Sequence, residues 1–340
     1  MTDSSEQSST SWFSGKKVLV TGGTGTLGSV MVPRLMDLGA QVSVTSIDPP
    51  ERVQAVLADP SVHKWGDLRD YDTCYEIAEN QDCVIHLMAV KGSTQIGTSR
   101  VASAYVPFLQ CNTNMMEAAF RQGVSRYLFV GSIGEYPAIP VRHEDNMWDG
   151  PPQANDRFMG IAKRAGETQA EAYAEEHGWD AVRIVRLSNV YGPYDDFDPR
   201  TAQVVPALIS RMVGGENPIT VAGDGSAVRD LIYSEDAAEG MIRAIEDAPP
   251  GLPINIGSGN GYAIKEVAEA IASLVPSSPE IQWDPTRPTG DKKRILATER
   301  AKEVLGFEAR TSLREGIRKT IEWYLDNSDL AQRRGKELHG

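Results

Sequence analysis

Residues Thr21–Gly28 read TGGTGTLG and join two segments of different character. The apolar run Lys16–Thr21 before them is typical of a buried parallel strand, whereas Ser29–Leu38 after them has helical spacing. Glycines let the backbone turn tightly and approach a pyrophosphate, and the N-terminus of a helix offers free N–H groups. The segment therefore predicts a dinucleotide site formed by Gly22, Thr24, Gly25, Thr26, Leu27 and Gly28.

Strand and helix patterns alternate from this loop to about residue 188. Further strands are expected at Gln41–Ile47, Cys83–Leu87, Tyr127–Val130 and Val182–Val185, with helices between them that include Tyr105–Gln122 and Lys163–His177. Such alternation indicates βαβ units. We therefore predict an α/β fold, a Rossmann-type doubly wound parallel sheet with a smaller, irregular C-terminal lobe that binds substrate.

Prolines and glycines become frequent after Asn189, and the pattern is less regular. Helices are expected at Ala202–Val213, Ile264–Leu274 and Leu313–Tyr324, and short strands near Ile219–Val221 and Ile254–Ile256. The predicted organisation is a disordered tail over 1–14, a dinucleotide-binding domain over 15–188, a substrate-binding lobe over 189–326 with segments returning to the sheet, and a polar tail over 327–340.

The 340 residues include 34 basic and 47 acidic side chains, a formal net charge of −13. Such a field repels phosphate backbones, so we expect no nucleic-acid partner. No apolar run reaches the about 18 residues of a membrane span, and the polar N-terminus does not resemble a signal peptide. The scattered Cys74, Cys83 and Cys111 have no metal-ligand spacing, so we expect no metal and a reduced, cytoplasmic setting.

The residues after the second strand bear on the choice of cofactor. An NAD site requires a carboxylate at the tip of that strand, about 20 residues after the glycine loop. Asp48 stands in that place, which favours NAD, but Ser46 with Arg52 could instead hold the 2′-phosphate of NADP. Asp67, in GDLRD, is placed either to accept a hydrogen bond from the adenine amino group or to stabilise a turn.

Several motifs occur in order between about residues 16 and 324, namely TGGTGTLG, GDLRD, HLMA, GSIGEYP, GIAKRAGE, RLSNVYGP, VRDLIYSEDAAEGM, NIGSG and LREGIRKTIEWY. Together they resemble the extended short-chain dehydrogenase/reductase family, which contains NAD-dependent nucleotide-sugar epimerases, dehydratases and reductases. Within that family the local resemblance is strongest to the GDP-fucose synthases. For the dinucleotide, the resemblance implies contacts from Asp67, Leu68, Leu87, Met88, Ala89 and Lys163 as well as from the glycine loop.

The resemblance also implies a set of catalytic residues, and this chain differs from the family at one of them. Ser132 matches the hydroxyl that hydrogen-bonds the reacting oxygen, and Lys163 matches the lysine of a YxxxK motif. Four residues before that lysine, where the family has its tyrosine acid/base, this chain has Met159. A thioether has no exchangeable proton. The cysteine and histidine positions of the fucose synthases fall on Gly134 and Gln203.

Three interpretations of this departure stay open. Glu135, beside Ser132, is either a replacement acid/base or a solvated loop carboxylate. Alternatively Lys163, or a water held by Ser132, carries the proton. In the third, the fold binds dinucleotide without turnover, as a sensor or scaffold. We favour an NAD(P)-dependent nucleotide-sugar epimerase, reductase or dehydratase type of enzyme with a non-standard acid/base.

The substrate implied by the resemblance is a nucleoside diphosphate sugar whose base stays undetermined. Arginine forks suit a diphosphate. The implied contacts are Lys91, Asn189, Tyr194, Gln203, Arg211, Arg229 and Arg287.

Assembly as a homodimer is implied through helices near 102–122 and 160–177. The first carries more large apolar side chains than one core-facing stripe needs, namely Tyr105, Phe108, Leu109, Met115, Met116 and Phe120. That excess fits a shared four-helix interface, and a wholly internal helix is the alternative.

Overall fold

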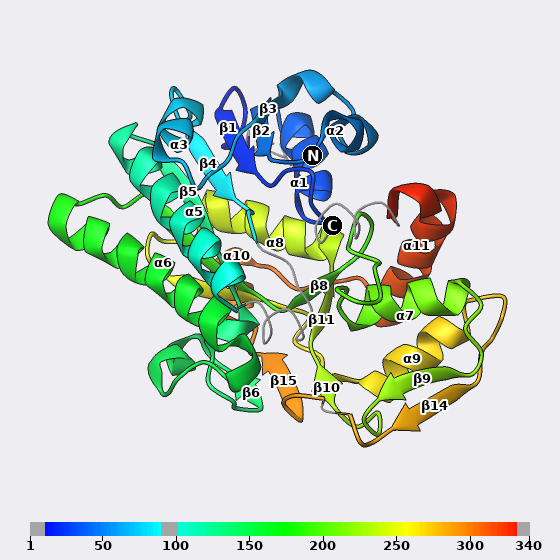
Figure 1. The fold of residues 1–340 in the computed structure, drawn as a ribbon. Helices are drawn as coiled ribbons and strands as arrows, with labels where there is room; N and C mark the ends of the chain where they lie inside the picture. The colour runs from blue at the N-terminus through cyan, green and yellow to red at the C-terminus, as the bar shows by residue number, and fades with distance from the viewer. Residues whose placement is uncertain (1–10, 90–100, 288, 332–340) are drawn as a thin grey trace, which may run out of the picture.

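The computed structural model describes residues 11–89, 101–287 and 289–331 (Figure 1). A seven-stranded sheet forms the larger part of the molecule. Its strands, in spatial order, are β3 (His63–Trp65), β2 (Gln41–Ser46), β1 (Lys17–Thr21), β4 (Cys83–His86), β5 (Arg126–Ser132), β7 (Val182–Leu187) and β12 (Pro253–Ile256). Every neighbouring pair is parallel. The predicted doubly wound parallel sheet is confirmed.

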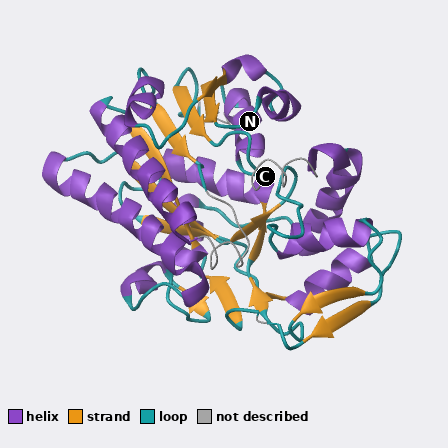
Figure 2. Ribbon diagram, in the orientation of Figure 1, coloured by secondary structure: helices purple, strands orange, loops and turns teal. Residues whose placement is uncertain are grey.

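Helices cover both faces of this sheet (Figure 2). One face carries α1 (Gly28–Asp37), α2 (Pro50–Val56), α8 (Ser234–Asp247) and α10 (Glu299–Leu305), and the other carries α3 (Tyr71–Ile77), α5 (Val101–Arg121) and α6 (Arg157–His177). Strand β1 shows the reason, because alternate side chains of a strand point to opposite faces. Val18 and Val20 pack with Met31 of α1, whereas Leu19 packs with Met115 of α5.

The remaining elements form a smaller C-terminal part with its own apolar core. Its helices are α7 (Val204–Val213), α9 (Ile264–Ala272) and α11 (Leu313–Asp326). A mixed sheet is formed by β13 (Tyr262–Ala263), β10 (Val228–Arg229), β15 (Lys293–Leu296) and β6 (Val141–Arg142). Two further pairs of strands are parallel: β11 (Leu231–Tyr233) with β8 (Asn189–Tyr191), and β14 (Ile281–Asp284) with β9 (Ile219–Ala222).

Four short 3₁₀ turns connect elements elsewhere in the described chain. They are η1 (Pro60–Val62), η2 (Ile133–Glu135), η3 (Glu144–Trp148) and η4 (Ala154–Asp156).

Both predicted tails are shorter than expected at their inner ends. Phe13 is fully buried in the sheet core, and the ring of Trp12 lies 4.1 Å from the Arg126 guanidinium. At the other end Ala331 is buried against the C-terminal core. These packed apolar side chains order segments whose composition is otherwise polar. Within the described ranges, every helix is too short or too polar to cross a bilayer.

Candidate active site

The glycine loop turns between β1 and α1 at the carboxyl edge of the sheet. Gly22 has a φ of +67°, a conformation that glycine adopts without strain, and a Cβ there would lie 3.3 Å from Met88. A Cβ on Gly28 would lie 2.3 Å from the Cα of Gly23, so only glycine permits this approach. The loop packs closely against the segment that follows β4 and leads directly into the N-terminus of α1, the arrangement that a dinucleotide site requires.

The cofactor-selecting carboxylate is held in place from both sides. The Thr24 hydroxyl donates to the carboxylate of Asp48, and the Nε of Arg52 lies 3.6 Å from Asp48 Oδ2. Arg52 is buried and donates from Nη2 to the Thr24 carbonyl oxygen at 2.9 Å. The guanidinium therefore ties the glycine loop to the end of β2, and the Asp48 side chain stays one-quarter exposed.

Ser46 lies beside Asp48 rather than in place of it. Its Oγ is 2.9 Å from Nε2 of His63 and accepts the Asp48 backbone N–H at 3.3 Å. Partial burial lowers the pKa of His63. Both residues proposed to select the cofactor thus stand at the carboxyl end of β2.

Asp67 follows β3 and pairs with a neighbour. Arg69 donates to it from Nε at 2.9 Å and from its backbone N–H at 3.0 Å. The hydrogen bond from Arg69 lowers the pKa of Asp67. Asp67 therefore stabilises a turn, which is one of its two expected roles. An adenine amino group would have to compete with the Arg69 side chain for this carboxylate.

The other expected dinucleotide contacts occupy the same edge. Leu68 is buried beneath Asp67, and Leu87 and Met88 follow β4. The Met88 backbone N–H donates to Thr21 Oγ1 at 3.3 Å, and Ala89 is exposed. Thr26 is buried and its hydroxyl lies 3.3 Å from Asp195, while Leu27 is the N-cap of α1. Lys91 lies outside the described residues.

His86 was not recognised from the sequence, although it is the buried end of β4. Its Nδ1 lies 3.0 Å from Thr21 Oγ1 and its Nε2 lies 3.0 Å from Asn112 Oδ1. Complete burial, with the nearby charge of Lys163, lowers its pKa to about 3. The imidazole is therefore neutral at physiological pH and orders the strand beneath the glycine loop.

Ser132 ends β5 and caps the turn η2. Its Oγ accepts the Gly134 N–H at 3.1 Å, and its own N–H donates to Oε1 of Glu135. Such reciprocal capping satisfies two backbone N–H groups at the start of the turn. Glu135 is completely buried, so the solvated loop carboxylate that we considered is wrong. Burial, with the nearby Glu167 carboxylate, raises the pKa of Glu135 well above its usual range.

Lys163 lies on the inner face of α6 and is buried. Its Nζ is 4.6 Å from the ring centre of Phe108 and 5.1 Å from that of Phe129. Burial lowers its pKa to about 8, while Glu135 and Glu167 oppose that shift. The ammonium group is therefore mostly charged at neutral pH and close to losing its proton.

Arg186 is the centre of a buried polar network that the sequence analysis missed. It lies in the otherwise apolar strand VRIVRL and donates to both carboxylate oxygens of Glu167. Its Nη1 donates to Tyr136 Oη at 2.9 Å, and that hydroxyl donates to Asn255 Oδ1 at 2.6 Å. The network joins β7, β12 and α6 to the segment that follows η2. The sequence feature that could have revealed this network is a charged residue inside an otherwise apolar strand.

Met159 lies one turn before Lys163 on α6 and is half buried. Asp156 directly precedes the helix, and its side chain contacts the region of Gly134. Sequence reasoning did not single out Asp156, although its spacing to Met159 and Lys163 is helical.

Two arginines expected to bind substrate have hydrogen-bond and ion-pair partners within the chain. Arg229 donates to the carbonyl oxygens of Val228 and Asp291 at 2.8 Å and of Thr289 at 2.7 Å. Arg211 pairs with Glu216. These guanidinium groups therefore brace loops of the C-terminal part.

The other expected substrate contacts differ in exposure. Asn189 donates to the carbonyl oxygen of Asp230 at 2.8 Å. Tyr194 has a φ of +59°, and its ring centre is 4.7 Å from that of Trp323. Gln203 and Arg287 are exposed. Within the described part of the chain, no hydrogen bond or ion pair joins Asn189, Tyr194, Gln203 and Arg287 to one another.

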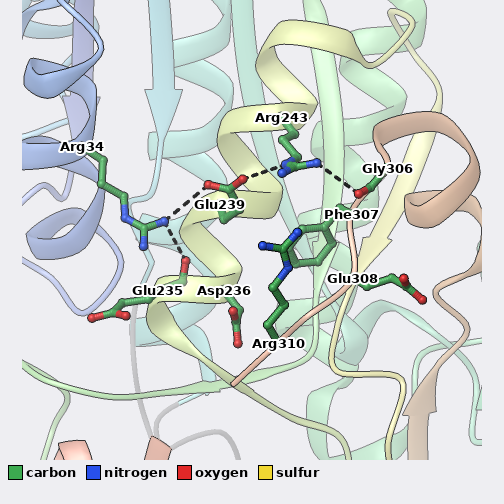
Figure 3. Close-up of a pocket in the computed structure, with 9 residues that line it drawn as sticks. All are labelled: Arg34, Glu235, Asp236, Glu239, Arg243, Gly306, Phe307, Glu308 and Arg310. Atoms are coloured by element: carbon green, nitrogen blue, oxygen red, sulfur yellow. Dashed lines mark hydrogen bonds and ion pairs between the residues drawn. The ribbon is translucent and has the colours of Figure 1, made fainter. Parts of the chain in front are cut away.

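A pocket of about 260 Å³ lies away from these residues, between α1, α8 and the segment after α10. Figure 3 shows Arg34, Glu239 and Arg243 pointing toward one another in it. Arg34 and Arg243 both pair with Glu239, and Arg243 Nη1 donates to the Gly306 carbonyl oxygen at 3.1 Å. These internal pairs join two helices, and the pocket holds none of the expected site residues.

Comparison with known proteins identifies the family of the chain. The sequence model of the NAD dependent epimerase/dehydratase family matches residues 18–257. The chain belongs to that family. The family and fold predicted from the motifs are confirmed, and family members of known activity include NAD(P)-dependent nucleotide-sugar epimerases and reductases.

Three relatives illustrate the range within the epimerase/dehydratase family. GDP-L-fucose synthase 1 of Arabidopsis thaliana is 30% identical over 319 residues, 92% of this chain and 94% of that protein. The dTDP-4-dehydro-6-deoxy-D-allose reductase of Streptomyces bikiniensis is 30% identical over 321 residues, 92% and 97% of the two chains. The UDP-glucose 4-epimerase of Thermotoga maritima, solved with UDP-glucose, has a TM-score of 0.80 at 28% identity and covers 92% and 99%.

Proposed function

We propose that this family member is an NAD(P)-dependent enzyme that modifies a nucleoside diphosphate sugar and works without the usual tyrosine. The observation that carries the proposal is the retained pair of Ser132 and Lys163 beside Met159. Ser132 ends β5 with a half-buried hydroxyl group, and Lys163 is a buried, charged lysine on the adjoining helix. A site that had lost turnover would have no reason to keep a buried charge, which is costly to maintain.

The cofactor of the proposed enzyme is NAD. Support comes from Asp48, which is held at the end of β2 by Thr24 and Arg52. A carboxylate in that place accepts hydrogen bonds from a ribose 2′-hydroxyl and repels a 2′-phosphate. The glycine loop and the N-terminus of α1 would hold the pyrophosphate, and Lys163 would hold the nicotinamide ribose. When bound, the nicotinamide would supply hydride chemistry.

Substrate is proposed to bind between the sheet edge and the C-terminal part. Arg229 and Arg211 are the groups whose charge suits a diphosphate. Their present partners are main-chain carbonyl oxygens and Glu216, so substrate binding would exchange some of these contacts for phosphate oxygens.

A homodimer through α5 and α6 is part of the proposal. Phe108, Met115 and Met116 are buried within the chain, but Val106, Phe158 and Ile161 keep 48%, 38% and 37% of their surface exposed. Exposed apolar groups on two packed helices suit a contact between copies. Light scattering at micromolar concentration should give twice the chain mass, and a monomer mass would overturn this part.

The first experiment is native mass spectrometry of freshly purified protein, followed by identification of the small molecules it releases. Retained NAD and a response to added nucleotide sugars support the proposal. Ser132→Ala and Lys163→Ala should each lower turnover at least 100-fold, as expected for groups that stabilise the reacting oxygen. Turnover unchanged in both variants would overturn the catalytic assignment.

A non-catalytic sensor or scaffold is the second candidate, and Met159 is the observation that favours it. Its thioether cannot exchange a proton. Dinucleotide binding without turnover of any nucleotide sugar, even in Met159→Tyr, would support this alternative.

A further inference from the structure

Asp156 directly precedes the helix that carries Met159 and Lys163. The three positions are separated by three and four residues, the intervals at which side chains of a continuous helix lie above one another. Asp156 is the N-cap of α6, and Lys163 lies two turns further on. A carboxylate therefore stands one turn from the position of Met159, on the side away from Lys163.

The Asp156 side chain occupies space that glycine leaves open. A Cβ on Gly134 would lie 3.1 Å from the Cβ of Asp156, 3.2 Å from its Cγ and 3.3 Å from its Oδ2. The N–H of the same Gly134 donates to Ser132 Oγ at 3.1 Å. The Asp156 carboxylate and the Ser132 hydroxyl therefore flank one residue, and a larger side chain at 134 would displace the carboxylate.

Two neighbours hold this carboxylate through a single oxygen. Arg294 donates from Nη2 to Oδ2 at 2.5 Å, and the side-chain amide of Gln153 donates to the same atom. Within residues 11–89, 101–287 and 289–331, no hydrogen bond reaches Oδ1. The side chain is 32% exposed. The group is thus fixed in orientation, and its second oxygen is available as an acceptor.

Glu135 is the other carboxylate near Ser132, but it faces the interior. Its Oε1 accepts the Ser132 N–H beneath the end of β5, and its Oε2 lies 3.8 Å from Arg186. It is fully buried, whereas Asp156 reaches solvent. Of these two described carboxylates, Asp156 is the one that combines an oxygen without a hydrogen bond with access from solvent.

We propose that Asp156 is the proton acceptor of this site and that it removes a proton from a carbon next to a keto group of the nucleotide sugar. The inference rests on the proposed function and specifies the type of reaction step that the enzyme performs. The C–H bond breaks, its proton passes to Asp156 Oδ1, and its electron pair moves onto the keto oxygen as an enolate. The Ser132 hydroxyl donates to that oxygen. Return of a proton to the carbon completes exchange, or epimerisation when it arrives from the opposite face.

The arrangement favours this step over reduction of the ketone. Reduction needs an acid that protonates the developing alkoxide, whereas Asp156 is ion-paired with Arg294 through Oδ2 and presents Oδ1 as an acceptor. Proton abstraction next to a carbonyl needs a base, which the ion-paired carboxylate supplies.

The test uses the protein with NAD in D₂O and GDP-4-keto-6-deoxymannose, dTDP-4-keto-6-deoxyglucose and UDP-4-keto-6-deoxyglucose as probes. Deuterium entry next to the keto group is followed by NMR and mass spectrometry. Asp156→Asn should slow exchange at least 100-fold, the lower range for loss of a general base, and leave NAD binding unchanged. Asp156→Glu should restore part of the rate. Asp145→Asn is the matched control, because Asp145 also pairs with an arginine, Arg300 at 2.8 Å, but is 84% exposed.

A second variant separates catalysis from structure. Arg294→Gln removes one of the two side chains that orient the Asp156 carboxylate, so exchange at saturating probe should slow at least tenfold while the dissociation constant of NAD stays unchanged. A merely structural Asp156 would leave the exchange rate at saturating probe unchanged.

An exchange rate in Asp156→Asn that stays within a few-fold of the rate of the unaltered protein would overturn the inference and leave the proposed function intact. Equal loss of NAD binding and exchange would show a structural role and would also overturn it. Absence of exchange in the unaltered protein, with NAD bound and all three probes, would overturn the inference, and turnover of a nucleotide sugar by another reaction would then decide whether the proposed function survives.

Discussion

Arg186 and Glu167 are joined by two parallel hydrogen bonds in the interior, from Nε to Oε1 at 2.8 Å and from Nη2 to Oε2 at 2.7 Å. The two side chains are only 2% and 7% exposed. The pair connects β7 to α6 and so sets the position of Lys163, which lies on α6 one turn before Glu167. A planar fork that meets a carboxylate at two points holds orientation as well as distance.

Arg186→Leu should lower the free energy of unfolding by about 3–5 kcal/mol, because it leaves the buried Glu167 carboxylate without its partner. Arg186→Lys should recover only part of this loss, since an ammonium group cannot form the two-point contact. Urea unfolding measures both. Arg318→Leu is the control, because Arg318 pairs with Glu315 and Glu322 on an exposed face. A urea concentration at half unfolding that is the same for Arg186→Leu and for the control would contradict the prediction.

Lys163 should give turnover, or the proposed exchange, an alkaline limb near pH 8. Burial lowers its pKa to about 8, so the ammonium form that stabilises an oxygen anion is present below this pH and disappears above it. Lys163→Arg should move the limb upward, because a guanidinium keeps its proton. The measurement is the rate from pH 6 to 10, with Lys265→Arg, an exposed lysine, as control. A limb that stays near pH 8 in Lys163→Arg belongs to another group.

His86 should make the fold sensitive to acid. Its pKa is about 3 in the fold, where burial excludes the charged form, and 6.5 is its ordinary value. Between these values the unfolded chain binds the proton and the folded chain does not, so stability is lost as pH falls from 6.5 toward 3. The slope is at most about 1.4 kcal/mol per pH unit for one such group.

His86→Gln should flatten that dependence, because a glutamine amide does not titrate and can still donate to Asn112. Urea unfolding at several pH values compares the two proteins, and His177→Gln, whose side chain is 37% exposed, is the control. Identical slopes for the unaltered protein and His86→Gln would show that His86 is not the responsible group.

Gly28→Ala should weaken dinucleotide binding at least tenfold, because its Cβ would lie 2.3 Å from the Cα of Gly23 and force the loop apart. Gly150→Ala is the matched control, since a Cβ there meets only Pro137, at an ordinary 3.5 Å. Calorimetric titration with NAD measures both variants. Unaltered affinity in Gly28→Ala would mean that the glycine loop does not hold the pyrophosphate.

Asp48→Ser should move the preference from NAD toward NADP by about tenfold or more. Removal of the carboxylate ends its repulsion of a 2′-phosphate and leaves the positive charge of Arg52 beside that position. The ratio of the two dissociation constants is the measurement, with Asp59→Ser, an exposed aspartate in the next turn, as control. A ratio that does not change would assign cofactor choice to other residues.

Local patterns predicted several main elements to within one or two residues, although α6 begins at Arg157, six residues before its expected start. The expected strand Gln41–Ile47 is observed as Gln41–Ser46, and the expected helix Ser29–Leu38 as Gly28–Asp37. Their periodicity and bounding glycines are properties of neighbours in the chain. Strands of two or three residues, such as Val228–Arg229, are too short to show a period, and α8 was not predicted.

The sequence alone determined the sheet, the glycine loop and the placement of Met159 four residues before Lys163, because each depends on spacing along the chain. Only the tertiary structure showed that Glu135 is buried and that Asp156 fills the space beside Gly134. Burial and contact between residues distant in the chain arise from the packing of α6 on η2 and the sheet. Those contacts decide which carboxylate is enclosed and which one meets solvent, and chain order does not specify them.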